Sequence, residues 1–159
     1  MKILLVVDQF FGANNGMTVS AQRFASVLSD HGHQVRVVCS AGNGEACPLY
    51  VYALPEQHIP FFDGLIASEG MRFARPQRRV LEEAVAWADV VHLYLPFVLS
   101  HETIRICRRL GKPCTAGFHV QPENISATLG LARSGPVNRG LYRMFDRYVY
   151  RWCGHIHCP

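Results

Sequence analysis

Short apolar runs alternate with amphipathic stretches from one end of the chain to the other. Runs rich in β-branched residues predict strands, and apolar positions spaced three to four apart predict helices. The expected strands are 2–8, 34–39, 48–55, 89–96, 113–119 and 155–158, and the expected helices are 18–33, 77–88, 97–111 and 137–153. Residues 59–70 are expected to form a Gly-rich, aromatic connection, and residues 120–136 a loop.

The first 40 residues show the pattern most clearly. The run Ile3–Val7 is continuously apolar, as in parallel strands that are buried on both faces. Val19, Phe24, Val27 and Leu28 fall on one face of the helix that follows. Strand, loop, helix and strand in this order form a βαβ unit, whose first loop lies at the carboxyl edge of the sheet. Its repetition along the chain predicts an α/β fold with a doubly wound parallel sheet.

Composition fits one folded domain spanning residues 1–159, because 49% of the residues are hydrophobic and only 18% are charged. The first apolar run is too short for a signal peptide or a membrane span. Six cysteines without a Cys-x-x-Cys pair indicate reduced thiols, so we expect a cytoplasmic protein. The net charge of +4 favours anionic partners without identifying one.

The loop that opens the first helix, within residues 10–24, is a candidate phosphate site. A helix amino terminus carries unpaired N–H groups and a partial positive charge, so it binds phosphate without a cationic side chain. The triphosphate-binding loop requires Gly-Lys-Ser/Thr, but Met17 follows Gly16. Cys39 and Ser40 stand where a dinucleotide fingerprint needs an acid, which disfavours a nicotinamide-dependent oxidoreductase. Alternatively, the loop glycines only turn the chain into the helix.

Three segments, "ILLVVDQFFGANNGMTVSAQRFASVLSDHGHQVRVVC", "ADVVHLYLPF" and "CRRLGKPCTAGFH", follow one another in the chain. Together they resemble the amino-terminal domain of the retaining GT-B glycosyltransferases of the fourth glycosyltransferase family, over residues 1–159. The resemblance implies one Rossmann-like half of a GT-B fold, which binds mainly the acceptor. The nucleotide-sugar domain lies outside these residues, so the chain alone is expected to be inactive.

The same resemblance implies roles for individual residues. Asn15, Gly16 and Met17 would lie over the donor diphosphate when the cleft closes. His119 would be catalytic, touching the transferred sugar or orienting the acceptor at the end of the strand 113–119. The alternative for His119 is a histidine that is hydrogen-bonded at a strand end.

Four further polar or aromatic residues are candidates for acceptor binding: Tyr94, Gln121, Glu123 and Asn124. The last three have side chains suited to hydroxyl groups, although Asn124 could instead cap a turn. The implied reaction is front-face displacement with retention. It needs a nucleotide-sugar co-substrate but no other cofactor and no metal.

Arg139, Arg143, Arg147 and Arg151 follow one another at intervals of four, beside an apolar and aromatic face of the same predicted helix. Such a helix suits an anionic membrane surface, and "HVQPENI" resembles the diacylglycerol glucosyltransferase branch. A lipid acceptor and a peripheral position on the inner membrane face are therefore hypotheses. The alternative is a solvated arginine face over a core stripe. A second cluster, Arg72, Arg75, Arg78 and Arg79, is equally ambiguous.

Cys153, His155 and His157 in "CGHIHC" would share one side of a strand, but they have no companion pair at zinc-finger spacing, so no metal site is expected. The expected partners are a nucleotide sugar and a small-molecule or lipid acceptor, not nucleic acid. A stand-alone sugar- or nucleotide-binding module without catalysis is the alternative function. The pattern leaves open the sugar, the nucleotide, the acceptor and the oligomeric state.

Overall fold

The structure is a computed structural model, and it describes residues 1–11, 16–41, 48, 50–58, 72–128 and 130–158. Six strands form one sheet in this part of the chain: β1 (Lys2–Gln9), β2 (Gln34–Ser40), β3 (Val51–Leu54), β4 (Val90–Leu93), β5 (Cys114–Gly117) and β6 (His155–His157). The helices are α1 (Gly16–Asp30), α3 (Arg78–Trp87), α4 (Val98–Leu110), α5 (Pro122–Thr128), α6 (Gly135–Tyr148) and the 3₁₀ turn η1 (Tyr150–Trp152).

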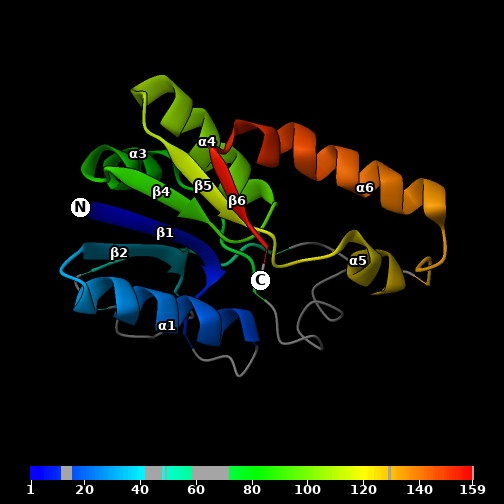
Figure 1. The fold of residues 1–159 in the computed structure, drawn as a ribbon, viewed down its shortest axis with the longest axis horizontal. Helices are drawn as coiled ribbons and strands as arrows, with labels where there is room; N and C mark the ends of the chain where they lie inside the picture. Colours follow the sequence, from blue (N-terminus) through cyan, green and yellow to red (C-terminus); the bar gives the residue numbers. More distant parts are fainter. Residues whose placement is uncertain (12–15, 42–47, 49, 59–71, 129, 159) are drawn as a thin grey trace.

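The described strands all pair in parallel, in the order β3-β2-β1-β4-β5-β6. The chain first moves from β1 to β2 and β3, and then crosses back to add β4, β5 and β6 on the other side. Because parallel crossovers are right-handed, this reversal puts α1 on one face of the sheet and α3, α4 and α6 on the other (Figure 1). The predicted α/β class and doubly wound parallel sheet are confirmed.

Strand β1 lies inside the sheet, between β2 and β4. Every residue of β1 after Lys2 is buried. Leu4 and Val6 belong to the core under α3, α4 and α6, whereas Leu5 and Val7 belong to the core under α1. The continuous apolar run is therefore the sequence of a strand covered on both faces.

Asp8 is an exception to the apolar character of β1. It is 2% exposed, and its Oδ1 accepts a hydrogen bond of 3.0 Å from the backbone N–H of Ala74. This bond joins the end of β1 to the segment that leads into α3. Burial raises the pKa of the Asp8 carboxyl to about 7.

Helix α1 differs from its expected packing. Thr18 and Ala21 are its buried residues, whereas Val19, Phe24 and Val27 are 39%, 40% and 51% exposed. The expected apolar face is therefore wrong for these three residues, whereas Leu28 is half-buried and packs against the core under α1. Small side chains face the sheet because they let the helix axis approach it, and the larger apolar ones lie toward its flanks.

The carboxyl-terminal third also departs from expectation in two places. Helix α5 forms inside the segment 120–136 that was expected to be a loop. Helix α6 ends at Tyr148, five residues before the expected end, because the backbone of Val149 (φ −130°, ψ −68°) leaves the helical region and η1 begins. The expected connection 59–70 lies outside the described residues.

Candidate functional site

The candidate site lies at the carboxyl edge of the sheet, where the strand order reverses between β1 and β4. In open α/β sheets this switch point leaves a crevice between loops that depart in opposite directions. Tyr94 follows β4 directly, and His119 comes two residues after β5. Helix α1 begins at Gly16, after the connection from β1, so all three positions belong to the same edge.

The start of α1 is tied to the end of β1 by side chains. Thr18 is fully buried, and its hydroxyl donates a hydrogen bond of 3.4 Å to the carbonyl oxygen of Gln9. Gln22 Nε2 donates one of 2.7 Å to the carbonyl oxygen of Phe10. These contacts hold the first turn of α1 over the end of β1.

The three predicted diphosphate residues have different surroundings. Gly16 is exposed, and a Cβ atom added to it would meet nothing within 4 Å. Met17 is half-buried against the core under α1, which also contains Tyr94. Asn15 lies outside the described residues. Of this set, the structure therefore describes one residue that is open to solvent, Gly16, and one that packs against the core, Met17.

A row of aromatic rings crosses from α1 to β5 over β4. The ring of Phe24 lies 5.4 Å from that of His92, and His92 meets Tyr94 edge to face at 5.2 Å. Tyr94 stacks on His119 with 4.8 Å between ring centroids and 9° between planes. Tyr94 is only 2% exposed, so its ring serves as the platform on which the imidazole of His119 rests.

The imidazoles near this row are biased toward the neutral form. Burial lowers the pKa of His119, and the neighbouring His157 lowers it further. Burial lowers the pKa of His92 to about 4, with smaller contributions from His119 and the histidines of β6. His92 Nδ1 lies 2.8 Å from the hydroxyl oxygen of Thr115. A neutral His119 can donate or accept a hydrogen bond at neutral pH without adding charge to the site.

The acceptor candidates after His119 are arranged around α5. Gln121 and Asn124 are exposed, and Asn124 lies inside α5 instead of capping it. Glu123 is half-buried, and its Oε2 accepts a hydrogen bond of 3.2 Å from the hydroxyl of Tyr142 on α6. Glu123 therefore links two helices, whereas Gln121 and Asn124 present their side chains to solvent.

The arginine row is shorter than predicted. Arg139, Arg143 and Arg147 are exposed on α6 and have no acidic partner among the residues that the structure describes. Arg151 falls in η1, where its Nη2 lies 2.6 Å from Oδ2 of Asp146. The four arginines thus do not share one continuous helix. In Figure 1, the amino-terminal end of α6 extends beyond the sheet.

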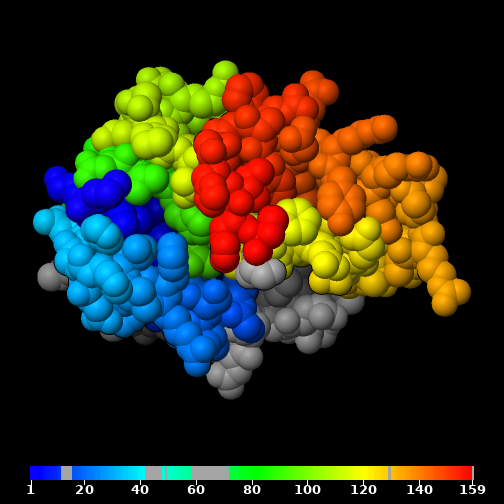
Figure 2. Space-filling view, viewed as in Figure 1, coloured from blue at the N-terminus to red at the C-terminus, as the bar shows by residue number. Residues whose placement is uncertain are grey.

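Cysteine and histidine near β6 face different surroundings. Cys153 packs against the core under α3, α4 and α6, whereas His157 approaches His119 with 6.3 Å between ring centroids. Across the described ranges, no group of three His, Cys, Asp or Glu residues is placed to hold a metal ion. All three residues of β6 are exposed, and the strand lies at the surface in the view of Figure 2.

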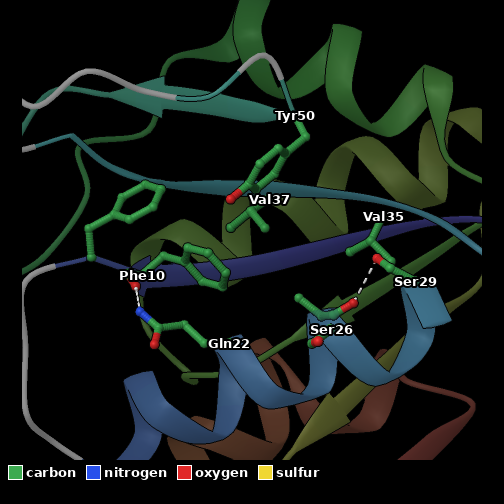
Figure 3. A pocket seen from close by; sticks show the side chains of 9 residues that line it. Phe10, Gln22, Ser26, Ser29, Val35, Val37 and Tyr50 are labelled. Atoms are coloured by element: carbon green, nitrogen blue, oxygen red, sulfur yellow. Dashed lines mark hydrogen bonds between the residues drawn. The ribbon is translucent and has the colours of Figure 1, made fainter.

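A cavity of about 390 Å³ lies between α1 and β2 (Figure 3). Its lining includes Phe10, Gln22, Val37 and Tyr50, and it includes none of the predicted site residues that the structure describes. It occupies the flank of α1 opposite to the one on which Phe24 meets His92. The cavity is therefore separate from the row of rings that leads to His119.

Sequence reasoning missed three residues of the candidate site. Phe24 was assigned to the core face of its helix, His92 was passed over as part of a strand, and Gly117 was not considered. His92 and Tyr94 have the alternate spacing that puts two side chains on one face of a strand, and Thr115 and Gly117 have it on β5. That spacing was the available signal.

The topology of the sheet and the position of the site together define the class of fold. The parallel strand order, with β1 inside the sheet, is that of Rossmann-like nucleotide-binding folds. The candidate residues lie at the switch point, which is where these folds bind ligands. The match to Glycosyltransferase Family 4 covers residues 14–159, so the chain belongs to this family.

The similarity to an individual protein of known activity is low. The chain is 24% identical, over 164 aligned positions, to a GDP-mannose-dependent alpha-mannosyltransferase of Mycolicibacterium smegmatis. The alignment covers 99% of this chain and 40% of the mannosyltransferase, so the chain spans less than half the length of that relative.

Solved structures give weaker likenesses. An alpha-glucosyltransferase in complex with UDP and a 13-mer DNA has a TM-score of 0.49 at 12% identity, covering 99% of this chain and 36% of that one. A UGT transferase from Siraitia grosvenorii in complex with UDP has a TM-score of 0.44 at 15% identity, covering 79% and 29%. Both scores are low, and the fold assignment rests on the strand order instead.

Proposed function

We propose that residues 1–159 are the amino-terminal, acceptor-side domain of a retaining glycosyltransferase that uses a nucleotide sugar. The observation that carries the proposal is the position of His119 and of the first turn of α1 at one edge of the sheet, on either side of the switch point. Family membership supports the reaction class. The second domain of a GT-B fold would supply most of the nucleotide contacts.

Each group has a chemical role in this proposal. The unpaired N–H groups and the dipole at the start of α1, with Asn15, Gly16 and Met17, would stabilise negative charge on the leaving diphosphate. The neutral imidazole of His119 would hydrogen-bond a hydroxyl of the transferred sugar near the anomeric carbon. Gln121 and Asn124, exposed beside it, would bind acceptor hydroxyls.

GDP-mannose is the first donor to test, because the curated relative depends on it. The experiment is a transfer assay of the full-length protein with a panel of GDP- and UDP-sugars. We expect turnover with one donor class and a loss of about 100-fold or more in kcat for His119→Ala, because the loss of one positioned hydrogen-bonding group at a reacting centre has effects of this size. The matched control is His31→Ala, since His31 is exposed at the end of α1, away from the edge.

Two outcomes would contradict the proposal. Undiminished transfer by His119→Ala would remove the imidazole from the reaction. Nucleotide-sugar binding without turnover against any acceptor class would instead support a stand-alone binding module.

A lipid acceptor, with diacylglycerol as the particular candidate, is the finer form of the proposal. Arg139, Arg143 and Arg147 support it, because three exposed cations on one helix, without an acidic partner in the described part of the chain, are suited to an anionic surface. Tyr142, Met144 and other large apolar residues on or beside α6 are 40–45% exposed. Among the described helices, none has the length and apolar content to cross a bilayer. The contact that we propose is peripheral, on the cytoplasmic face of the inner membrane.

Flotation with vesicles tests the membrane contact. Near an anionic surface each arginine contributes about 1 kcal/mol, so replacing Arg139, Arg143 and Arg147 with alanine should weaken binding by about 100-fold. The control removes the same charge elsewhere, at three exposed arginines of other helices that belong to neither arginine cluster: Arg23, Arg105 and Arg109. Equal losses in both triple variants, or binding indifferent to anionic lipid, would refute the contact. Transfer to diacylglycerol in the same vesicles tests the acceptor separately.

A further inference from the structure

The imidazole of His119 is folded back against its own strand. A Cβ atom added to Gly117 would lie 2.5 Å from Cδ2 of His119 and closer still to Nε2. Real Cβ atoms do not come within 3.0 Å of other heavy atoms. The ring therefore occupies the space that a side chain at position 117 would fill, and only glycine leaves that space open.

The two nitrogens of this ring have different surroundings. Nε2 is buried and has no hydrogen-bond partner among the described residues. Nδ1 also makes no hydrogen bond to the described chain but, unlike Nε2, it is not buried. Nδ1 is thus the ring nitrogen that solvent reaches, while the Nε2 edge faces Gly117.

The ring is held on a second side by Tyr94. The two rings are stacked and nearly parallel, with 9° between their planes and 4.8 Å between their centroids. Tyr94 is itself buried in the core under α1, so it offers a fixed surface. The backbone of Gly117 and the ring of Tyr94 together determine both the place of the imidazole and its rotation.

We propose that Gly117 is a positioning residue for the transfer reaction: it seats the imidazole of His119 so that Nδ1, and not Nε2, meets the bound sugar. This inference rests on the proposed function for its catalytic consequence. The seat is the space that the backbone of Gly117 and the ring of Tyr94 leave for the imidazole. It is a property of the folded chain and can be measured without turnover.

Nuclear magnetic resonance of the full-length protein labelled with ¹⁵N-histidine tests the seat directly. In the wild type, the ring protons of His119 should be shifted upfield by the stacked Tyr94. On addition of GDP-mannose or the active donor, Nδ1 of His119 should shift more than Nε2. A larger response at Nε2 would overturn the proposal.

Gly117→Ala is the diagnostic variant, and Gly154→Ala is its matched control. A Cβ atom at Gly154, next to β6, would meet only the carbonyl oxygen of Cys114 at 3.9 Å, an ordinary contact. In Gly117→Ala the upfield shift should be lost, and the pKa of the displaced, more exposed imidazole should rise toward the ordinary value. Gly154→Ala should change neither. An unchanged His119 signal in Gly117→Ala would refute the seat.

Kinetics then separate a positioning role from a structural one. Gly117→Ala should lower kcat by roughly 10- to 100-fold, with KM for the donor little changed, because a misplacement of about 1 Å has effects of this size. The double variant Gly117→Ala/His119→Ala should be no slower than His119→Ala, since Gly117 acts through the ring. A further loss in the double variant would contradict the positioning role.

A variant pair at Tyr94 keeps the inference testable if Gly117→Ala does not fold. Tyr94→Phe retains a ring and should preserve the upfield shift of the His119 protons, whereas Tyr94→Leu should lose it. Equal behaviour of the two would overturn the stacking half of the seat. If wild-type signals show the seat but His119→Ala transfers sugar normally, the proposed function fails and the seat remains.

Discussion

Replacing Asp8 with asparagine should change how the stability of the fold depends on pH. Asp8 is 2% exposed in the central strand, and its Oδ1 accepts the N–H of Ala74. Its amide substitute keeps an oxygen for that hydrogen bond but does not titrate. Because the same shape remains, the comparison isolates the ionisation of one buried carboxyl.

The magnitude follows from the pKa. Burial raises the pKa of Asp8 from 3.8 to about 7. Between these values the folded chain holds a proton that the unfolded chain has released, so the free energy of unfolding decreases as pH rises. A rise of about 3 pKa units, at 1.36 kcal/mol per unit, corresponds to about 4 kcal/mol lost between pH 4 and 7.

The assay is urea denaturation followed by circular dichroism at unit steps from pH 4 to pH 8. The quantity to compare is the difference between Asp8→Asn and wild type, because other titrating groups are common to both. This difference should shift by about 4 kcal/mol in favour of the variant as pH rises from 4 to 7 and then level off. Asp30→Asn, at an exposed position of α1, is the control. A difference that stays constant with pH would refute the reasoning.

Three other predictions concern stability. His92 has a pKa lowered to about 4, so it has the opposite sign: its contribution is present above pH 6.5 and decreases by about 3 kcal/mol as pH falls to 4. His92→Asn should abolish that decrease in the same titration, and a retained decrease would contradict the assignment. Gly111 ends α4 with φ +65°, so Gly111→Ala should lower the free energy of unfolding by about 1 kcal/mol. Gly140 lies inside α6, where glycine is unfavourable, so Gly140→Ala should raise the free energy of unfolding by about 0.5–1 kcal/mol. Losses in both glycine variants would argue against the conformational explanation. Phe145 is 1% exposed and is the large buried side chain of α6. Phe145→Ala should therefore lower the free energy of unfolding, measured by urea denaturation, by about 3–5 kcal/mol. A loss under 1 kcal/mol would show that contacts other than those of Phe145 attach α6 to the sheet.

Much of the fold was predictable because its signals are local. The apolar run of β1 and the amphipathic spacing in α3 and α4 determined the element order, and the alternation of strands and helices determined the parallel sheet. Helix α5 was missed because "PENISAT" is a weak helix former. Contacts with the rest of the chain accompany it: Ser126 is buried, and Glu123 bonds to Tyr142 on α6. The periodicity of the sequence does not reveal contacts between residues that are far apart in the chain.

The candidate site was predictable to the level of the sheet edge and no further. A histidine at the end of a parallel strand belongs at the carboxyl edge whatever its neighbours are, so His119 could be selected from the sequence. The orientation of its ring depends on the absent side chain of Gly117 and on the buried face of Tyr94, which stands more than 20 positions earlier. No pattern along the chain links these three residues, because their contact exists only after β4 and β5 have paired.

The edge position of β6 has a consequence for the lifetime of the site. Within the described residues, β6 pairs only with β5, through three exposed residues, whereas β1 is flanked by β2 and β4. Amide hydrogens should therefore exchange with solvent first in β6 and last in β1, since strand edges open at lower free energy than strand centres. His157 of β6 is the register partner of Gly117. Each transient detachment of this short strand would uncover the backbone against which the imidazole rests, and a partner or substrate that protects the β6 amides would prolong the alignment of the His119 ring.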